Sequence, residues 1–94
     1  MNVYFEVTFK GGRGTLFMEI SRNGKVVDSR EWTESGKKWI DLNPGAYMAS
    51  LTGNSAPKGS EFQAFATSDP ETPIQIGPGA IGKIISLHIK KSST

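Results

Sequence analysis

Apolar and polar residues alternate along most of this chain, and that period of two is the feature that most limits its fold. In residues 2–10, Val3, Phe5, Val7 and Phe9 share one face, and the intervening residues share the other. Successive side chains of a β-strand point to opposite faces, so the pattern predicts a strand with one buried face. No window carries a 3.6-residue apolar repeat of helix length. The sequence therefore predicts an all-β chain without substantial helix.

Turn residues divide the chain into short segments of this kind. The predicted strands cover residues 2–10, 15–22, 25–32, 37–42, 46–52, 61–67, 74–76 and 81–91. The 11 glycines and 5 prolines fall almost wholly between these segments, as they do between strands in general. Seven or eight short strands with regular turn signals predict an antiparallel β-sandwich or barrel, and we expect the sandwich. A length of 94 residues fits a single domain over residues 1–94.

Several kinds of chemistry lack the residues that they need. The chain has no cysteine, which excludes disulfide bonds, thiolate metal sites and thiol catalysis. The single histidine, His88, has no further ligands at metal-binding spacing. No Gly-x-Ser-x-Gly elbow is present. We therefore expect no catalytic residues, no metal, no cofactor and no enzymatic activity.

Charge and hydropathy restrict the partners that we expect. The net charge of +2 is too small to predict nucleic-acid binding. No apolar stretch approaches the ~20 residues of a membrane helix, so we expect no membrane insertion. The first residues lack the basic start and apolar run of a signal peptide. The chain is expected in the cytoplasm if it is complete, and outside the cell or in the periplasm if it is an excised domain.

The pair Asn23-Gly24 predicts a two-residue type I′ hairpin turn. Regular pairing from that turn puts Phe17 opposite Arg30, with Trp32 diagonal to Phe17 on the same face. Leu16, Met18 and Ile20 are the expected core face of their strand. The three side chains on the opposite face would therefore form an aromatic and cationic patch on the sheet surface. They are candidate ligand-binding residues.

Two other arrangements remain open for that hairpin. A β-bulge near Asp28 would reverse the parity of the strand and bury Trp32 in the core. Alternatively, a loop of the same chain covers the patch. Trp39 is a second candidate for ligand binding, together with Lys37 and Asp41 in the same predicted strand.

The segment Asp41-Leu42-Asn43-Pro44-Gly45-Ala46-Tyr47 resembles the Leu-x-Pro-Gly-x-Tyr entry to a strand in small β-sandwiches. It is similar to carboxypeptidase-regulatory, or transthyretin-like, domains and to fibronectin type III and other immunoglobulin-like domains. The resemblance implies a structural corner in which the tyrosine bonds to upstream backbone and the leucine packs beneath it. That corner would consist of Leu42, Pro44, Gly45 and Tyr47. The resemblance also implies a non-catalytic module for spacing, adhesion or ligand binding.

Two functions follow as expectations. The first is an interaction or structural module that mediates protein–protein contact or self-association. In its support, residues 84–89 are apolar on both faces, which predicts either a central strand or an edge that pairs with another chain. The alternative is a carbohydrate-binding module, because sugar rings pack on aromatic faces. Trp32 with Arg30, or Trp39 with Asp41 and Lys37, would then supply the binding surface.

Overall fold

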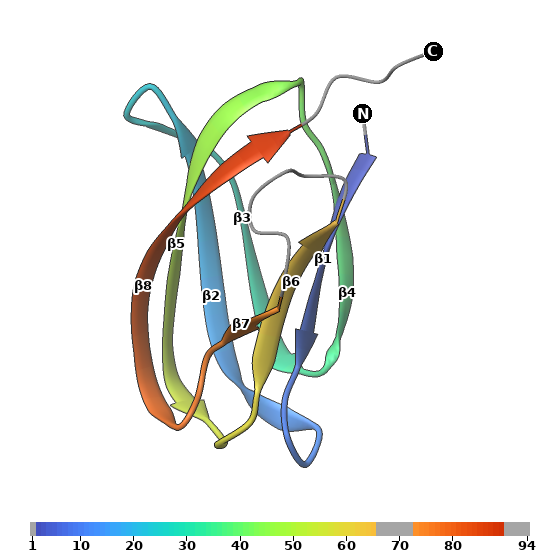
Figure 1. The fold of residues 1–94 in the computed structure, drawn as a ribbon, viewed down its shortest axis with the longest axis vertical. Coiled ribbons are helices and arrows are strands. Elements are labelled where there is room, and N and C mark those ends of the chain that lie inside the picture. Colours follow the sequence, from blue (N-terminus) through green and yellow to red (C-terminus); the bar gives the residue numbers. More distant parts are fainter. Residues whose placement is uncertain (1, 66–72, 90–94) are drawn as a thin grey trace.

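The computed structural model describes residues 2–65 and 73–89, and it is a sandwich of two antiparallel β-sheets (Figure 1). One four-stranded sheet, here the β1 sheet, has the order β4-β1-β6-β7. Its strands are β1 (Asn2–Thr8), β4 (Gly36–Asp41), β6 (Glu61–Phe65) and β7 (Ile74–Gln75). The other, the β2 sheet, has the order β3-β2-β5-β8. Its strands are β2 (Arg13–Arg22), β3 (Lys25–Glu34), β5 (Gly45–Ala56) and β8 (Gly79–Ile89). The prediction of an all-β antiparallel sandwich is confirmed.

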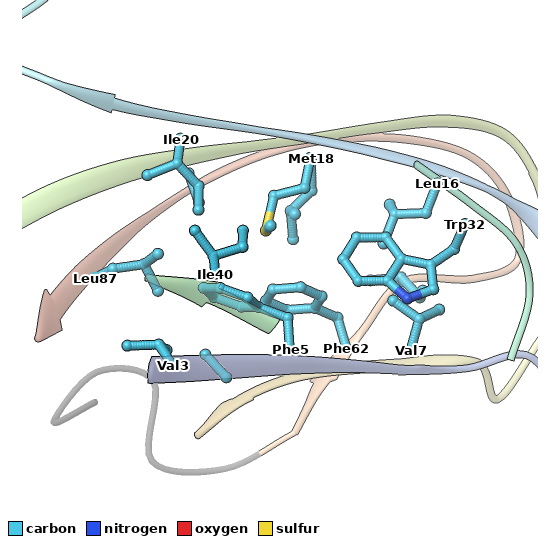
Figure 2. Packing of buried hydrophobic residues seen from close by; sticks show 14 of the residues in the cluster. Val3, Phe5, Val7, Leu16, Met18, Ile20, Trp32, Ile40, Phe62 and Leu87 are labelled. Atoms are coloured by element: carbon cyan, nitrogen blue, oxygen red, sulfur yellow. The ribbon is translucent and has the colours of Figure 1, made fainter. Parts of the chain in front are cut away.

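The hydrophobic core lies between the two sheets and follows the alternation of the sequence (Figure 2). From the β1 sheet, Phe5 is fully buried and stacks on Phe62 with ring centroids 5.9 Å apart. From the β2 sheet, alternate residues of β2 point inward to meet them. The core residues of β1 and β2 are Val3, Phe5, Val7, Leu16, Met18 and Ile20. These two strands each bury one face, as period-two alternation requires.

A β-bulge changes the register of the β2–β3 hairpin close to its turn. Ser21 pairs with Val26 as regular pairing predicts, but Ile20 pairs with Asp28, so Val27 is an extra residue. The extra residue reverses the face that each later residue of β3 occupies. Trp32 consequently pairs with Leu16 and is 2% exposed. The predicted outward position of Trp32 is wrong, and the bulged alternative is confirmed.

The buried Trp32 fills the end of the sandwich beside Leu16 and Val7 (Figure 2). Its indole Nε1 donates a hydrogen bond to the carbonyl oxygen of Gly36 at 3.2 Å. Its ring meets that of Phe62 edge-on, with centroids 6.5 Å apart and an interplanar angle of 84°. A buried indole N–H needs such a partner. The bond also joins β3 of one sheet to β4 of the other.

Each long side of the sandwich is closed by a lysine on an edge strand. On the β3–β4 side, the Lys38 amino group lies 5.9 Å from the centre of the Trp32 ring. On the β7–β8 side, the Lys83 amino group donates to the Gln75 carbonyl oxygen at 2.9 Å. Inward-pointing charges on edge strands disfavour uncontrolled pairing with other sheets. Of the two positions predicted for the last strand, central or edge, the structure shows the edge, because β8 pairs with β5 alone among the described strands.

The strand predicted over residues 46–52 is longer than expected, since β5 continues to Ala56. Its pairing with β2 shifts register between Thr15 and Phe17, and the two backbones approach closely at that shift. A Cβ added to Gly53 would lie 2.2 Å from the Thr15 carbonyl oxygen. Only glycine fits there without moving the backbone.

We expect Gly53→Ala to lower the free energy of unfolding by about 1–3 kcal/mol, because the new methyl group overlaps backbone of β2. Gly82→Ala in β8 is the matched control, since a Cβ at that position meets nothing within 4 Å. The control should change the free energy of unfolding by less than about 0.5 kcal/mol. Urea denaturation of both variants measures the difference. Equal midpoints would contradict the close approach of β2 and β5.

Candidate functional site

Three aromatic side chains form a row across the outer face of the β1 sheet. Trp39 of β4 pairs with Tyr4 of β1, and Tyr4 pairs with Phe65 of β6. The Trp39 and Tyr4 ring centroids are 4.5 Å apart with an interplanar angle of 43°. Those of Tyr4 and Phe65 are 4.2 Å apart at 11°. Neighbouring strands stand about 4.8 Å apart, so directly opposed rings stack along the hydrogen-bonding direction. We call these residues the aromatic row.

The three side chains of the aromatic row differ in exposure. Tyr4 and Phe65 are half-buried, whereas Trp39 is 58% exposed. The reason is its position, because β4 is the first strand in the sheet order and borders only β1 (Figure 1). Tyr4 covers one side of the indole, and no strand among the described residues covers the other. Trp39 is therefore a large apolar ring at a free sheet edge.

Polar and charged side chains surround Trp39 on the same face. Lys37 and Asp41 lie two residues before and after it in β4. The Lys37 amino group is 5.2 Å from the centre of the Tyr4 ring, a cation–π contact. Lys37 also pairs across the strands with Glu6, which carries the opposite charge. The face thus has one apolar row bordered by charges of both signs.

The patch predicted from the β2–β3 hairpin does not form. Phe17 is 39% exposed on the outer face of the β2 sheet, opposite Glu31. Arg30 instead pairs with the buried Met18, and its guanidinium forms an ion pair with Asp28. Because the bulge moves Arg30 and Trp32 to the other face, neither lies beside Phe17. The proposed grouping of these three residues is wrong.

Trp39 is the predicted binding residue that the structure places on the surface with its proposed neighbours, Lys37 and Asp41. Sequence reasoning missed Tyr4 and Phe65 as members of the same site. Alternation put Tyr4 on the face opposite Val3, Phe5 and Val7, but alternation within a strand does not reveal which strands are neighbours. β4 and β6 flank β1 through connections that cross between the sheets.

Tyr47, near the start of β5, makes two hydrogen bonds through its hydroxyl group. The Tyr47 hydroxyl donates to the Asn43 carbonyl oxygen at 2.7 Å and accepts from Arg22 Nη1 at 3.3 Å. The Arg22 guanidinium also lies 5.2 Å from the centre of the Tyr47 ring. Leu42 is buried. Gly45, after Pro44, has a φ of +145°, a conformation that side chains disfavour.

Within residues 2–65 and 73–89, no three His, Asp or Glu side chains gather in a group that could hold a metal ion. The same ranges contain no helix long and apolar enough to cross a membrane. Comparison with protein-family models, curated protein sequences and solved structures found no match.

We expect Tyr47→Phe to lower the free energy of unfolding by about 1–2 kcal/mol, because it leaves the Asn43 carbonyl without this donor. Tyr4→Phe removes the same hydroxyl from a half-buried ring on the outer face. It should change the free energy of unfolding by less than about 0.5 kcal/mol. Urea denaturation compares the two variants. An unchanged midpoint for Tyr47→Phe would show that the corner bond contributes nothing to stability.

The two tryptophans should differ several-fold in acrylamide quenching, because Trp32 is buried and Trp39 is exposed. The Trp39→Phe variant, in which Trp32 is the only indole, should emit at short wavelength and quench weakly. The Trp32→Phe variant should emit at longer wavelength and quench strongly. Far-ultraviolet circular dichroism confirms that both variants remain folded. Equal quenching of the two folded variants would contradict this placement.

Proposed function

We propose that this domain is a non-catalytic interaction module of the immunoglobulin-like or transthyretin-like type, which binds a protein partner along the free edge of β4. The observation that carries the proposal is Trp39, 58% exposed on a strand whose outer edge borders no other described strand. The Tyr47 bond to Asn43 supports the structural type, since a tyrosine fastens a corner in this way in such sandwiches.

A protein partner suits this edge for two physical reasons. An edge strand presents a row of unpaired N–H and C=O groups, to which an extended segment of another chain can add as a further strand. An exposed tryptophan then supplies a large apolar contact next to those backbone bonds, and tryptophan is enriched at protein interfaces. β4 provides both features within six residues.

Carbohydrate binding is the second candidate, favoured by the presence of Lys37 and Asp41 beside an exposed indole. A sugar-binding platform needs aromatic faces open to the ligand. The Tyr4 and Phe65 rings are stacked on each other at 11°, and Trp39 lies against Tyr4 on its other side. Both faces of Tyr4 are therefore covered. The row offers one indole rather than a continuous platform, which favours the protein partner.

A photo-crosslinking residue at position 39 tests the protein partner directly. Trp39 is replaced by p-benzoylphenylalanine, and the chain is irradiated in the cells that naturally produce it. We expect a discrete protein adduct, because an added strand would lie beside this side chain. The matched control carries the same residue at Phe17, which is exposed on the outer face of the other sheet. Equal adducts at both positions, or none at position 39, would contradict the proposal.

A titration with soluble polysaccharides tests the carbohydrate alternative. The indole N–H signals of the two tryptophans are followed by two-dimensional NMR while each glycan is added. The proposal predicts no saturable shift of the Trp39 signal. A saturable shift of that signal, with the buried Trp32 signal unchanged, would overturn the protein-binding function in favour of the carbohydrate-binding one.

A further inference from the structure

The outward side chains of β4 carry charges in an order that suits antiparallel pairing with a second, identical strand. Lys37, Trp39 and Asp41 lie at every second position and so share the outer face. Trp39 is the middle of the three, with a positive charge on one side and a negative charge on the other. When two such strands run antiparallel with Trp39 opposite Trp39, each Lys37 stands opposite an Asp41. A strand with this order of charges matches a second copy of itself.

Resting on the proposed function, we infer that the partner at this edge is a second copy of the chain, with its β4 added antiparallel to β4 and the two Trp39 residues opposed. Antiparallel pairing of identical strands has a two-fold axis, so the same contacts form twice. The pair gains two Lys37–Asp41 cross-strand contacts, each of the favourable opposite-charge type. The two β1 sheets become one continuous sheet.

The aromatic row gives a second reason to centre the pairing of the two β4 strands on Trp39. Within one copy, the rings of Trp39 and Tyr4 are in contact at a 4.5 Å centroid distance, and Tyr4 and Phe65 at 4.2 Å. Strand addition in the proposed register places a second indole on the side of Trp39 that Tyr4 does not cover. The row then continues from one copy into the other. Burial of the two indoles removes the largest exposed aromatic surface of the described residues from water.

The inner face of β4 is compatible with this pairing. In the same register Lys38 stands opposite Ile40 of the second copy. Lys38 is half-buried and its amino group lies over Trp32 of its own copy, 5.9 Å from the ring centre. The charge therefore points into its own sandwich, and the aliphatic part of the side chain can pack against the opposed isoleucine. Lys38 restricts the β4 edge to partners that can pack against an inward-pointing lysine. The register with Trp39 opposite Trp39 meets this condition, because it places Ile40 of the second copy opposite Lys38.

The edge of β8 is a less suitable surface for a second copy. Ile84 is 68% exposed, but its outward neighbours Ser86 and His88 provide no pair of opposite charges to set a register. Lys83 is tied to Gln75 of β7 across the sandwich. The order of charges found in β4 is missing from β8, so β4 is the edge that specifies one pairing.

Sedimentation equilibrium of the purified full chain, from about 10 µM to about 1 mM, measures the association. We expect a monomer–dimer equilibrium for the natural sequence. Lys37→Asp places two acids opposite each other in both contacts, and Asp41→Lys places two bases there. Each variant alone should dimerise at least about tenfold more weakly, because two favourable contacts become repulsive. A mixture of the two variants should form a heterodimer, since every opposed pair is then of opposite charge.

Three further variants make the result specific. Lys58→Asp changes the same charge at an exposed position outside the strands and should leave the dimerisation constant within about twofold. Trp39→Ala should weaken dimerisation by about tenfold, through the loss of the central aromatic pair. Ile84→Lys, on the β8 edge, should leave it unchanged. Circular dichroism and urea denaturation confirm that each variant is folded.

Two outcomes would overturn the inference. A dimer that is lost in Ile84→Lys but kept in Lys37→Asp would place the interface at β8. A folded chain that remains monomeric at about 1 mM would exclude self-pairing. If the crosslink at position 39 nevertheless yields an adduct with a different protein, the proposed function stands and only the second copy is excluded.

Discussion

The β-bulge at Val27 determines which of the later side chains of β3 face the core and which face outward. Without the extra residue, the alternation of β3 would turn Trp32 toward solvent and Glu31 toward the core. With it, the indole closes one end of the sandwich, contacts Phe62, and bonds to Gly36 at the start of β4. A thin core of this size depends on each large side chain that it holds. The bulge thus couples the hairpin of one sheet to the edge strand of the other.

The Trp32 bond lies at the start of β4, and the candidate site follows from the position of β4 at the edge of its sheet. The chain leaves β3 at Glu34 and crosses to the other sheet, where β4 pairs with β1 and becomes an edge. The same pairing puts Trp39 beside Tyr4 and leaves the indole uncovered on its outer side. One tryptophan is therefore packed in the core, while the other is exposed at the edge of a sheet. Lys38, the residue before Trp39 in β4, points inward and lies over the ring of the buried Trp32.

Period-two alternation, with the turn residues, was sufficient to predict the all-β sandwich, the approximate positions of its strands and the inward residues of β1 and β2. It did not give the full length of β5, and the predicted strand ends at residues 66–67 and 90–91 lie outside the described residues. It was insufficient for Trp32, because a single extra residue reverses the faces and no local pattern near Asp28 requires it. It was also insufficient for the aromatic row, since Tyr4, Trp39 and Phe65 come from strands far apart in the chain. Contacts between strands depend on their order in the sheet, which alternation does not encode. Trp39 was selected from the sequence because sugar rings pack on aromatic faces, with Lys37 and Asp41 as its polar neighbours.

Proton–proton distances across the β2–β3 hairpin provide the sharpest test of the β-bulge, because the burial of Trp32 depends on the register of that hairpin. In antiparallel strands, directly opposed residues give nuclear Overhauser effects between α-protons at non-hydrogen-bonded pairs and between amide protons at hydrogen-bonded pairs. The bulged register predicts contacts that pair Met18 with Arg30 and Leu16 with Trp32, together with contacts from the Trp32 indole to the Val7 methyl groups. Contacts that instead pair Phe17 with Arg30 and leave the indole without core neighbours would contradict it. In that case Trp32 would be a surface residue.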